Sequence, residues 1–251
     1  MGLGVVDAHV TVGPSDVLGV EVTGDMVIKC LEENGVDAAL VMPAPESADP
    51  FREHDQIAET AEKYPNRIFG IASVNPFRFG AEKTVDEIER CIKDLDFVGV
   101  NIDQLVWYLP AHSKPAEPII KKTSQLGVPM ICGAGASASA QAQYIGHVAQ
   151  RHPDIDFILS HIVPGQDSHT TVLTILEHEN VYVEISRSMP YEFRDVLRAV
   201  GADRVLFGSD PQGASWIEAV YLYMVRKHGL PPDQERLVLG ENAKKIFRLK
   251  E

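Results

Sequence analysis

The chain has 251 residues, of which 45% are hydrophobic and 24% are charged. This composition is typical of a globular protein, and it excludes a disordered, collagenous or disulfide-stapled chain. The net charge is −13, and no block of Lys or Arg offsets it. We therefore expect neither a nucleic acid nor an anionic membrane surface as a partner.

The sequence also carries signals about the cellular compartment. The beginning, MGLGVVDAHVTVGP, lacks the basic segment and apolar run of a secretory signal, and no stretch approaches about 18 uninterrupted apolar residues. Cys30, Cys91 and Cys132 are odd in number and widely separated, which argues against a disulfide framework and favours a reducing compartment. We expect a soluble, cytoplasmic protein.

Short β-branched segments alternate along the chain with longer amphipathic segments. The predicted strands are residues 5–10, 38–43, 67–74, 97–102, 128–133, 156–162, 181–186 and 204–210. The predicted helices are residues 24–35, 54–64, 81–95, 117–127, 139–152, 170–180, 191–200 and 214–229. The strands are mostly apolar on both faces, as in a parallel sheet that helices cover.

Eight strand-and-helix units in one uninterrupted series favour a (β/α)8 TIM barrel over a doubly wound open sheet, which more often has five or six strands. Residues 233–249 are predicted to add a C-terminal helix after the eighth unit. No linker interrupts the series, so we expect a single domain over residues 1–251.

In such a barrel, polar residues at the carboxyl ends of the strands meet over one mouth. Asp7, His9 and Thr11 alternate along the first strand and are expected to face the same side. His161 ends the sixth strand and Asp210 ends the eighth. The sequence therefore predicts a catalytic set of His9, His161 and Asp210, with Asp7 orienting His9 or accepting backbone amides.

Several segments resemble the amidohydrolase superfamily, and most closely its amidohydrolase-2 branch, which includes aminocarboxymuconate semialdehyde decarboxylase. They are, in family order, DAH on the first strand, KYPNRIFGIASVNP, GVPMICGAG, SHIVPG, ENVYVEIS, FGSDP and GENAKKIF. The resemblance covers most of the chain. It implies a (β/α)8 barrel and an enzyme that hydrolyses or decarboxylates a small molecule.

The metal ligands of that family are only partly present. Its first strand carries HxH and its fifth ends in His, and with the Asp of the eighth strand these hold a catalytic zinc. Here Thr11 and Gly133 stand at two of those positions, while His9 and Asp210 match. His161 matches a family residue that acts chiefly on substrate or bound water. A stable zinc site needs three protein ligands, so the sequence favours an enzyme without a cofactor over one with zinc.

Three functions are compatible with these residues. The leading prediction is metal-independent hydrolysis of a lactone, amide or ester, for which the superfamily has a precedent in the pyrone dicarboxylate lactonases. Asp210 would be the general base, and His161 and His9 would donate hydrogen bonds or protons. The second is a zinc-dependent hydrolase or non-oxidative decarboxylase with His9, Asp210 and His161 as ligands. The third is a barrel without catalysis that serves as a binding or scaffold subunit.

Cations and aromatic residues in the predicted mouth loops point to a small, carboxylate-bearing substrate. Arg52, Arg187 and Lys114 are the cations, and an Arg can hold a carboxylate through two hydrogen bonds. Trp107, followed by Tyr108, is predicted to wall the pocket, although aromatic packing over a barrel rim would look the same.

Other ionisable residues leave alternatives open. Glu184 ends the seventh strand and faces either the mouth or the helix layer. His54 and His112 lie in predicted mouth loops, where either could replace a missing metal ligand. The apolar helix faces are compatible with a monomer and with a homo-oligomer.

Overall fold

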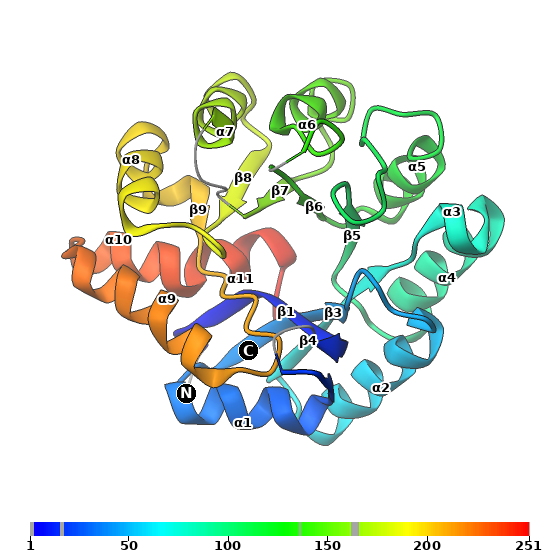
Figure 1. Ribbon diagram of the computed structural model, residues 1–251, viewed down its shortest axis with the longest axis horizontal. Helices are drawn as coiled ribbons and strands as arrows, with labels where there is room; N and C mark the ends of the chain where they lie inside the picture. The colour runs from blue at the N-terminus through cyan, green and yellow to red at the C-terminus, as the bar shows by residue number, and fades with distance from the viewer. Residues whose placement is uncertain (1–2, 16–17, 136, 162–165, 251) are drawn as a thin grey trace.

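The computed structural model describes residues 3–15, 18–135, 137–161 and 166–250, which form a ring of helices around a curled sheet (Figure 1). The strands lie in the order β2-β1-β3-β4-β5-β6-β7-β8-β9. Their bounds are β1 Val6–Ser15, β2 Val20–Val22, β3 Ala38–Pro43, β4 Ile68–Ser73, β5 Gly99–Asp103, β6 Met130–Gly133, β7 Phe157–Ser160, β8 Val181–Glu184 and β9 Val205–Leu206. All neighbouring strands from β1 to β9 in this order pair in parallel, and β2 alone pairs antiparallel, with β1.

The two ends of the parallel series meet. The amide of Ala8 in β1 donates to the carbonyl of Phe207, and the amide of Asp210 donates to the carbonyl of His9, at 2.9 Å each. These bonds join the segment after β9 back to β1 and confirm the predicted (β/α)8 barrel. The predicted eighth strand was longer than β9, because residues 207–210 follow β9 without regular strand pairing.

Helices cover the outside of the barrel, as Figure 1 shows. Their bounds are α1 Gly24–Asn34, α2 Pro50–Lys63, α3 Pro76–Phe79, α4 Ala81–Asp94, α5 Glu117–Leu126, α6 Ala142–Ala149, α7 Gln166–Glu177, α8 Pro190–Val200 and α9 Ser215–His228. Each predicted helix overlaps one of these. The short α3 and the β1–β2 hairpin were not predicted, because neither has a run long enough to show a period.

The alternation of side chains along the strands divides the core in two. One cluster packs between the sheet and the helices, and it includes Val41, Val100 and Phe157. The other fills the inside of the barrel, and it includes Leu40 and Ile158. Strands with apolar residues on both faces can supply both clusters, which is why a parallel sheet forms here.

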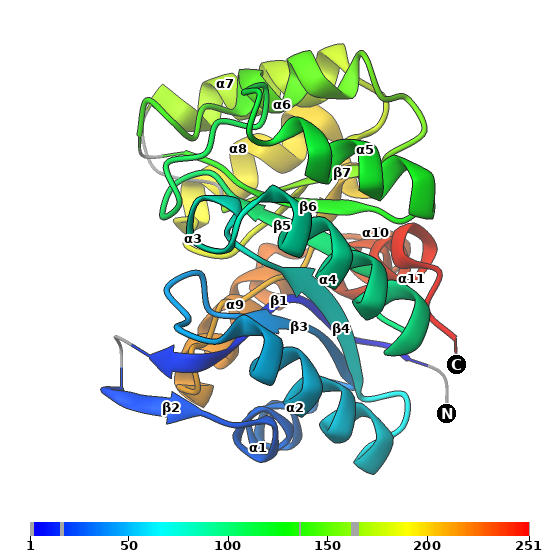
Figure 2. The ribbon, with the colours of Figure 1, turned by 90° about the vertical axis from the view of Figure 1, so that its right-hand side faces the viewer.

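The C-terminal segment closes the barrel at the end opposite the mouth. It consists of α10 Pro232–Arg236, a π-helical turn at Leu237–Glu241 and α11 Asn242–Phe247, which follow one another without a gap, so the predicted extra helix is confirmed. Phe247 joins the inner cluster and lies against Gly99, the first residue of β5. Figure 2 shows α11 beside both termini, with the β1–β2 hairpin at the far end.

The predicted strand 156–162 and the motif SHIVPG extend into residues 162–165, which lie outside the described residues. Among the described residues, no helix has the length and apolar character needed to cross a bilayer.

Candidate active site

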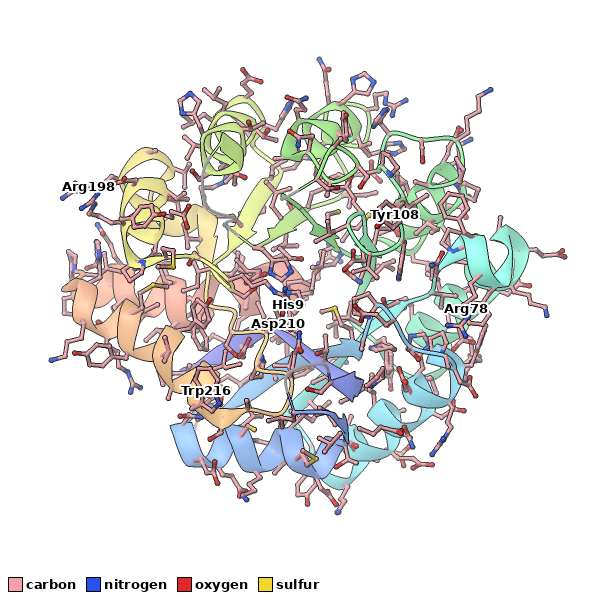
Figure 3. All side chains as sticks on the ribbon, viewed as in Figure 1. His9, Arg78, Tyr108, Arg198, Asp210 and Trp216 are labelled. Carbon is pink, nitrogen blue, oxygen red and sulfur yellow. The ribbon has the colours of Figure 1, made fainter. Side chains whose placement is uncertain are left out.

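The mouth of the barrel holds a cavity of about 530 Å³. It is lined by His9, Thr11, Pro14, Ala44, Pro45, Glu46, Asp103, Leu105, Val106, His161, Arg187, Ser209, Asp210, Gln212, Trp216, Ile217, Val220 and Tyr221. His9 and Asp210 lie together at the centre of the ring in Figure 3, whereas Arg78 and Arg198 lie at its periphery. The structure thus brings together the three residues predicted as catalytic, within a volume suited to a small molecule.

Glu184, at the end of β8, holds this cluster together through hydrogen bonds. Its Oε1 accepts hydrogen bonds from His9 Nδ1 at 3.0 Å, the His161 amide at 2.8 Å and Ser186 Oγ at 2.7 Å, and its Oε2 accepts from the Ser186 amide at 2.6 Å. Burial raises the pKa of Glu184, but these bonds and the neighbouring charges outweigh burial and lower it to about 2. Glu184 is therefore an ionised, fully buried carboxylate that faces the site.

The two histidines next to Glu184 differ in protonation. Their rings stack with centroids 4.9 Å apart. Burial lowers the pKa of His9, but the hydrogen bond and charge of Glu184, with the charge of Asp210, raise it to about 9. Burial and the charge of His9 lower the pKa of His161 to about 4. At neutral pH, His9 is therefore protonated and positively charged, whereas His161 is neutral.

The hydrogen bonds of Ser186 define the tautomer of His161. Ser186 Oγ has one proton, which it donates to the ionised Glu184. The same oxygen lies 2.6 Å from His161 Nδ1, so it accepts a proton from that nitrogen. Nδ1 of His161 is therefore protonated, and its Nε2 carries the lone pair. A neutral imidazole with this tautomer can act as a base at Nε2.

Asp210 is held by Arg187, which follows β8. Its Oδ2 accepts from Arg187 Nε at 2.8 Å and Nη2 at 2.7 Å. Burial raises the pKa of Asp210, but the charges of His9, His161 and Arg187 lower it below its usual value. Asp210 is thus an ionised partner of Arg187 and a weak base.

Three of these residues have a strained backbone. His161 has φ of 70°, Arg187 of 58° and Asp210 of 48°, in the left-handed region that glycine favours. Such conformations cost about 1 kcal/mol or more each, and they persist where the surroundings enforce them. They turn these side chains inward where their strands end.

Asp7 does not share a face with His9, contrary to the expected alternation. Val6 and Ala8 belong to the inner cluster, and the register against β3 shifts between Asp7 and Val10. Asp7 instead accepts from the amides of His9 and Ser209 at 3.0 Å each and from Ser209 Oγ at 2.5 Å. Asp7 thus joins β1 to the segment after β9 as an acceptor of backbone amides.

Of the residues predicted to bind substrate, one lines the cavity and three do not. Arg187 lines the cavity, but Arg52, Lys114 and Trp107 do not belong to its lining. Arg52 and Lys114 are exposed, because α2 and the β5–α5 loop turn them toward solvent. Trp107 is buried, and its Nε1 donates to the carbonyl of Pro45 at 2.9 Å, so it fastens two loops together.

The two alternative histidines also lie outside the cavity lining. His54 is fully buried, with Nδ1 at 2.8 Å from Glu87 Oε1 and Nε2 accepting from the Ser73 amide at 3.0 Å. Both of its nitrogens are therefore in use within the helix layer. His112 is exposed and packs against Tyr144, with ring centroids 4.2 Å apart.

The donor set fits a divalent metal ion poorly. Among the described residues, His9, His161 and Glu184 each offer an atom within 4.8 Å of the others. Nδ1 of each histidine is hydrogen-bonded, to Glu184 or to Ser186, so each could offer only Nε2 to an ion. The two oxygens of Glu184 already accept four hydrogen bonds, which leaves this carboxylate poorly placed to be the third ligand. Asp210 is not in this group.

The remaining family ligand positions do not complete the set. Thr11 offers only a hydroxyl, and Gly133 has no side chain. A cation beside Asp210 would meet the guanidinium of Arg187, which repels it.

Ser186 and Asp103 were missed in the sequence. Ser186 follows Glu184 at the spacing of one strand alternation, which is a weak signal for a shared face. Asp103 ends β5 and lines the cavity, so its position at a strand end was the available signal.

The chain matches known proteins in family and in fold. The amidohydrolase family model matches residues 27–249, and no curated protein matches the chain. The 2,6-dihydroxybenzoate decarboxylase from Rhizobium has a similar structure, with a TM-score of 0.74 and 17% identity over 99% of both chains.

Two further structures show the same fold. The 5-carboxyvanillate decarboxylase from Novosphingobium aromaticivorans, complexed with manganese and 4-hydroxy-3-methoxy-5-nitrobenzoic acid, has a TM-score of 0.69 and 15% identity over 89% of this chain and 79% of that one. A probable 2-pyrone-4,6-dicarboxylic acid hydrolase from Acinetobacter baumannii, with citric acid bound, has a TM-score of 0.69 and 15% identity over 98% of this chain and 99% of that one.

Proposed function

The chain belongs to the amidohydrolase family, in its amidohydrolase-2 branch, and on that premise we propose that it hydrolyses a lactone, ester or amide bond in a small carboxylate-bearing molecule without a metal ion. The observation that carries the proposal is the stacked pair of His9 and His161 over Glu184. One ring is protonated and the other is not, which is the arrangement that combined acid and base catalysis requires.

The first chemical step follows from these protonation states. Nε2 of His161 accepts a proton from water as the water oxygen attacks the substrate carbonyl. His9 donates its proton, or a hydrogen bond, to the carbonyl oxygen as that oxygen becomes negative. Because one histidine gains a proton as the other gives one up, the pair keeps a single positive charge. In the second step, the carbonyl re-forms and the bond to the leaving oxygen or nitrogen breaks. The His161 imidazolium gives its proton to that leaving atom, and His9 recovers any proton that it gave to the carbonyl oxygen.

Arg187 is the residue that we assign to substrate binding. Its Nε and Nη2 hold Asp210, and its side chain is 53% exposed. Nη1 is thus left to bind a substrate carboxylate beside the reacting groups. Arg52, Lys114 and Trp107 are not part of this proposal, because none of them lines the cavity.

Non-oxidative decarboxylation is the second candidate, and the cationic His9 favours it. When a carboxylate leaves as CO2, the electron pair stays on carbon, and a nearby imidazolium can supply the proton that replaces it. The same side chains serve both reactions, so the products of turnover decide between them.

Three free cysteines support a cytoplasmic setting. Cys30, Cys91 and Cys132 are all buried and unpaired by disulfides. Free thiols of this kind are usual in a reducing compartment. We propose that the protein acts there on a small molecule, with no nucleic acid or membrane partner.

The proposal is tested by screening lactones, esters, amides and aromatic acids with the wild-type protein, then comparing His161→Asn and His9→Gln with the control His112→Asn. We expect hydrolysis that falls by at least about a hundredfold in the first two variants and is unchanged in the control. The rate should be constant between about pH 4 and pH 9, because His161 must be neutral and His9 protonated. Turnover that survives both site substitutions would refute the assignment. No turnover at all would favour a binding barrel.

A further inference from the structure

Asp103 is a carboxylate of the cavity that the proposed reaction does not use. It is the last residue of β5, and its Oδ1 accepts from the Val106 amide at 2.7 Å. The next residue, Gln104, holds the loop in place: its Nε2 donates to the carbonyl of Gly133 at 2.9 Å and its Oε1 accepts from the Ala111 amide at 2.8 Å. Asp103 is therefore fixed at the mouth rather than free to swing into solvent.

Gly133 makes room for this carboxylate. A Cβ added at Gly133 would lie 3.3 Å from Asp103 Cγ and 3.4 Å from its Oδ1, which is tighter than ordinary contact. Any larger side chain at this position would press on Asp103 or cover it. The absence of a side chain at the end of β6 thus leaves the Asp103 carboxylate open to the cavity.

The charge of Asp103 is only partly balanced by cations: His9 and Arg187 act on it without direct pairing, and burial outweighs them. His9 pairs with Glu184, and Arg187 pairs with Asp210. Among the described residues, no Lys, Arg or His nitrogen makes an ion pair with Asp103. Burial raises its pKa, which shows that the surroundings disfavour its negative charge. A carboxylate in such a place costs free energy unless a cation joins it.

Part of the wall of the cavity that Asp103 lines is apolar. Leu105, Val106, Ile217 and Val220 line the cavity with apolar side chains. The net charge of −13 also favours the approach of a positive group over a negative one.

We propose that Asp103 is a specificity-determining residue that binds a protonated amino group on the substrate. The substrate would then be zwitterionic, with its carboxylate at Arg187 and its amino group at Asp103. This inference rests on the proposed function, from which it takes the site and the carboxylate contact.

The test measures binding of three matched probes by isothermal titration calorimetry near pH 7. The probes are 4-(aminomethyl)benzoate, 4-(hydroxymethyl)benzoate and 4-methylbenzoate, which differ in charge and hydrogen bonding but little in size. We expect the wild-type protein to bind the amine at least about tenfold more tightly than the other two. Equal or weaker binding of the amine, or no binding of any probe, would overturn the inference.

Two substitutions test whether Asp103 causes the preference for the amine. Asp103→Asn keeps the shape and removes the charge, so it should abolish the preference and keep the affinity for 4-methylbenzoate. The matched control is Glu46→Gln, which neutralises an exposed carboxylate at the rim of the same cavity and should keep the preference. A preference that persists in Asp103→Asn would contradict the assignment. Far-ultraviolet circular dichroism would check that each variant is folded. The comparison of the three probes on the wild-type protein does not depend on the variants.

The outcomes separate this inference from the proposed function. Arg187→Met should weaken all three probes, because it removes the proposed carboxylate contact. If 4-methylbenzoate binds in an Arg187-dependent way and the amine has no advantage, the inference about Asp103 fails and the proposed carboxylate contact stands. If binding does not depend on Arg187, the proposed carboxylate contact fails.

Discussion

Replacing Glu184 by Gln removes the charge that keeps His9 protonated. Without it, burial becomes the dominant influence on the imidazole, and the His9 pKa should fall from about 9 to below its ordinary value of 6.5. That change corresponds to about 3 kcal/mol of lost interaction with the protonated ring. The variant should therefore hold a neutral His9 at pH 7 and lose most of its activity.

The same substitution changes how stability depends on pH. The folded pKa of His9 lies above its unfolded value, so the pair with Glu184 stabilises the wild-type fold below about pH 6.5 and loses this effect as the pH rises through about 9. The free energy of unfolding of the wild-type protein, measured in urea, should therefore fall between about pH 6.5 and pH 9. The free energy of unfolding of Glu184→Gln should not show this fall.

Nitrogen-15 spectra of the histidine rings, recorded as a pH titration, measure the first effect directly. The matched control is Glu192→Gln, which alters a buried glutamate that accepts the Met189 amide. Among the described residues, Glu192 makes no hydrogen bond or ion pair with a histidine. His9 should titrate near pH 9 in the wild-type protein and in this control. A cationic His9 at pH 7 in Glu184→Gln would refute the reasoning.

Three further predictions concern other parts of the structure. Burial raises the pKa of Glu53 to about 7, and its Oε2 has no hydrogen-bond partner among the described residues. Glu53→Gln should therefore stabilise the fold by about 1–3 kcal/mol at pH 8 and by less at pH 5 in urea unfolding, and equal effects at both pH values would contradict this. Gly70→Ala should destabilise the fold by about 1–3 kcal/mol, because its Cβ would lie 2.3 Å from the Phe97 ring, and an unchanged urea midpoint would count against it. Arg187→Met should raise the pKa of Asp210, which carboxyl carbon-13 titration can follow, and an unshifted titration would mean that their ion pair is absent in solution.

The barrel was predictable because each strand is apolar on both faces and each helix has its own period. These signals are local, so they survive without knowledge of distant contacts. The β1–β2 hairpin was not predictable, since Val20–Val22 is too short to show alternation. The π-helical turn between α10 and α11 packs against β1 and β9, and no local sequence pattern reports it.

The site was predictable only in part. His9, His161 and Asp210 could be grouped because strand ends converge in a parallel barrel. Asp7 was misplaced because a register shift in β1 reverses the alternation that the sequence suggests. Arg52 was expected at the mouth but is exposed outside the cavity lining, because the direction of a side chain on a loop or a first helical turn depends on tertiary packing.

The shared role of Glu184 could not be derived either. It depends on three hydrogen bonds to Oε1, and their partners come from β1, the residue after β7 and the residues after β8. The single-domain organisation stays a prediction from the sequence.

The central claim is that this site works through its histidine pair and without a metal ion. It is tested most directly by the metal content of the protein, purified from cells grown with added zinc and manganese and measured by inductively coupled plasma mass spectrometry. The account predicts far less than one ion per chain, with turnover unchanged by a chelator. One tightly held ion per chain that is lost in His9→Gln, together with turnover that a chelator abolishes, would contradict it.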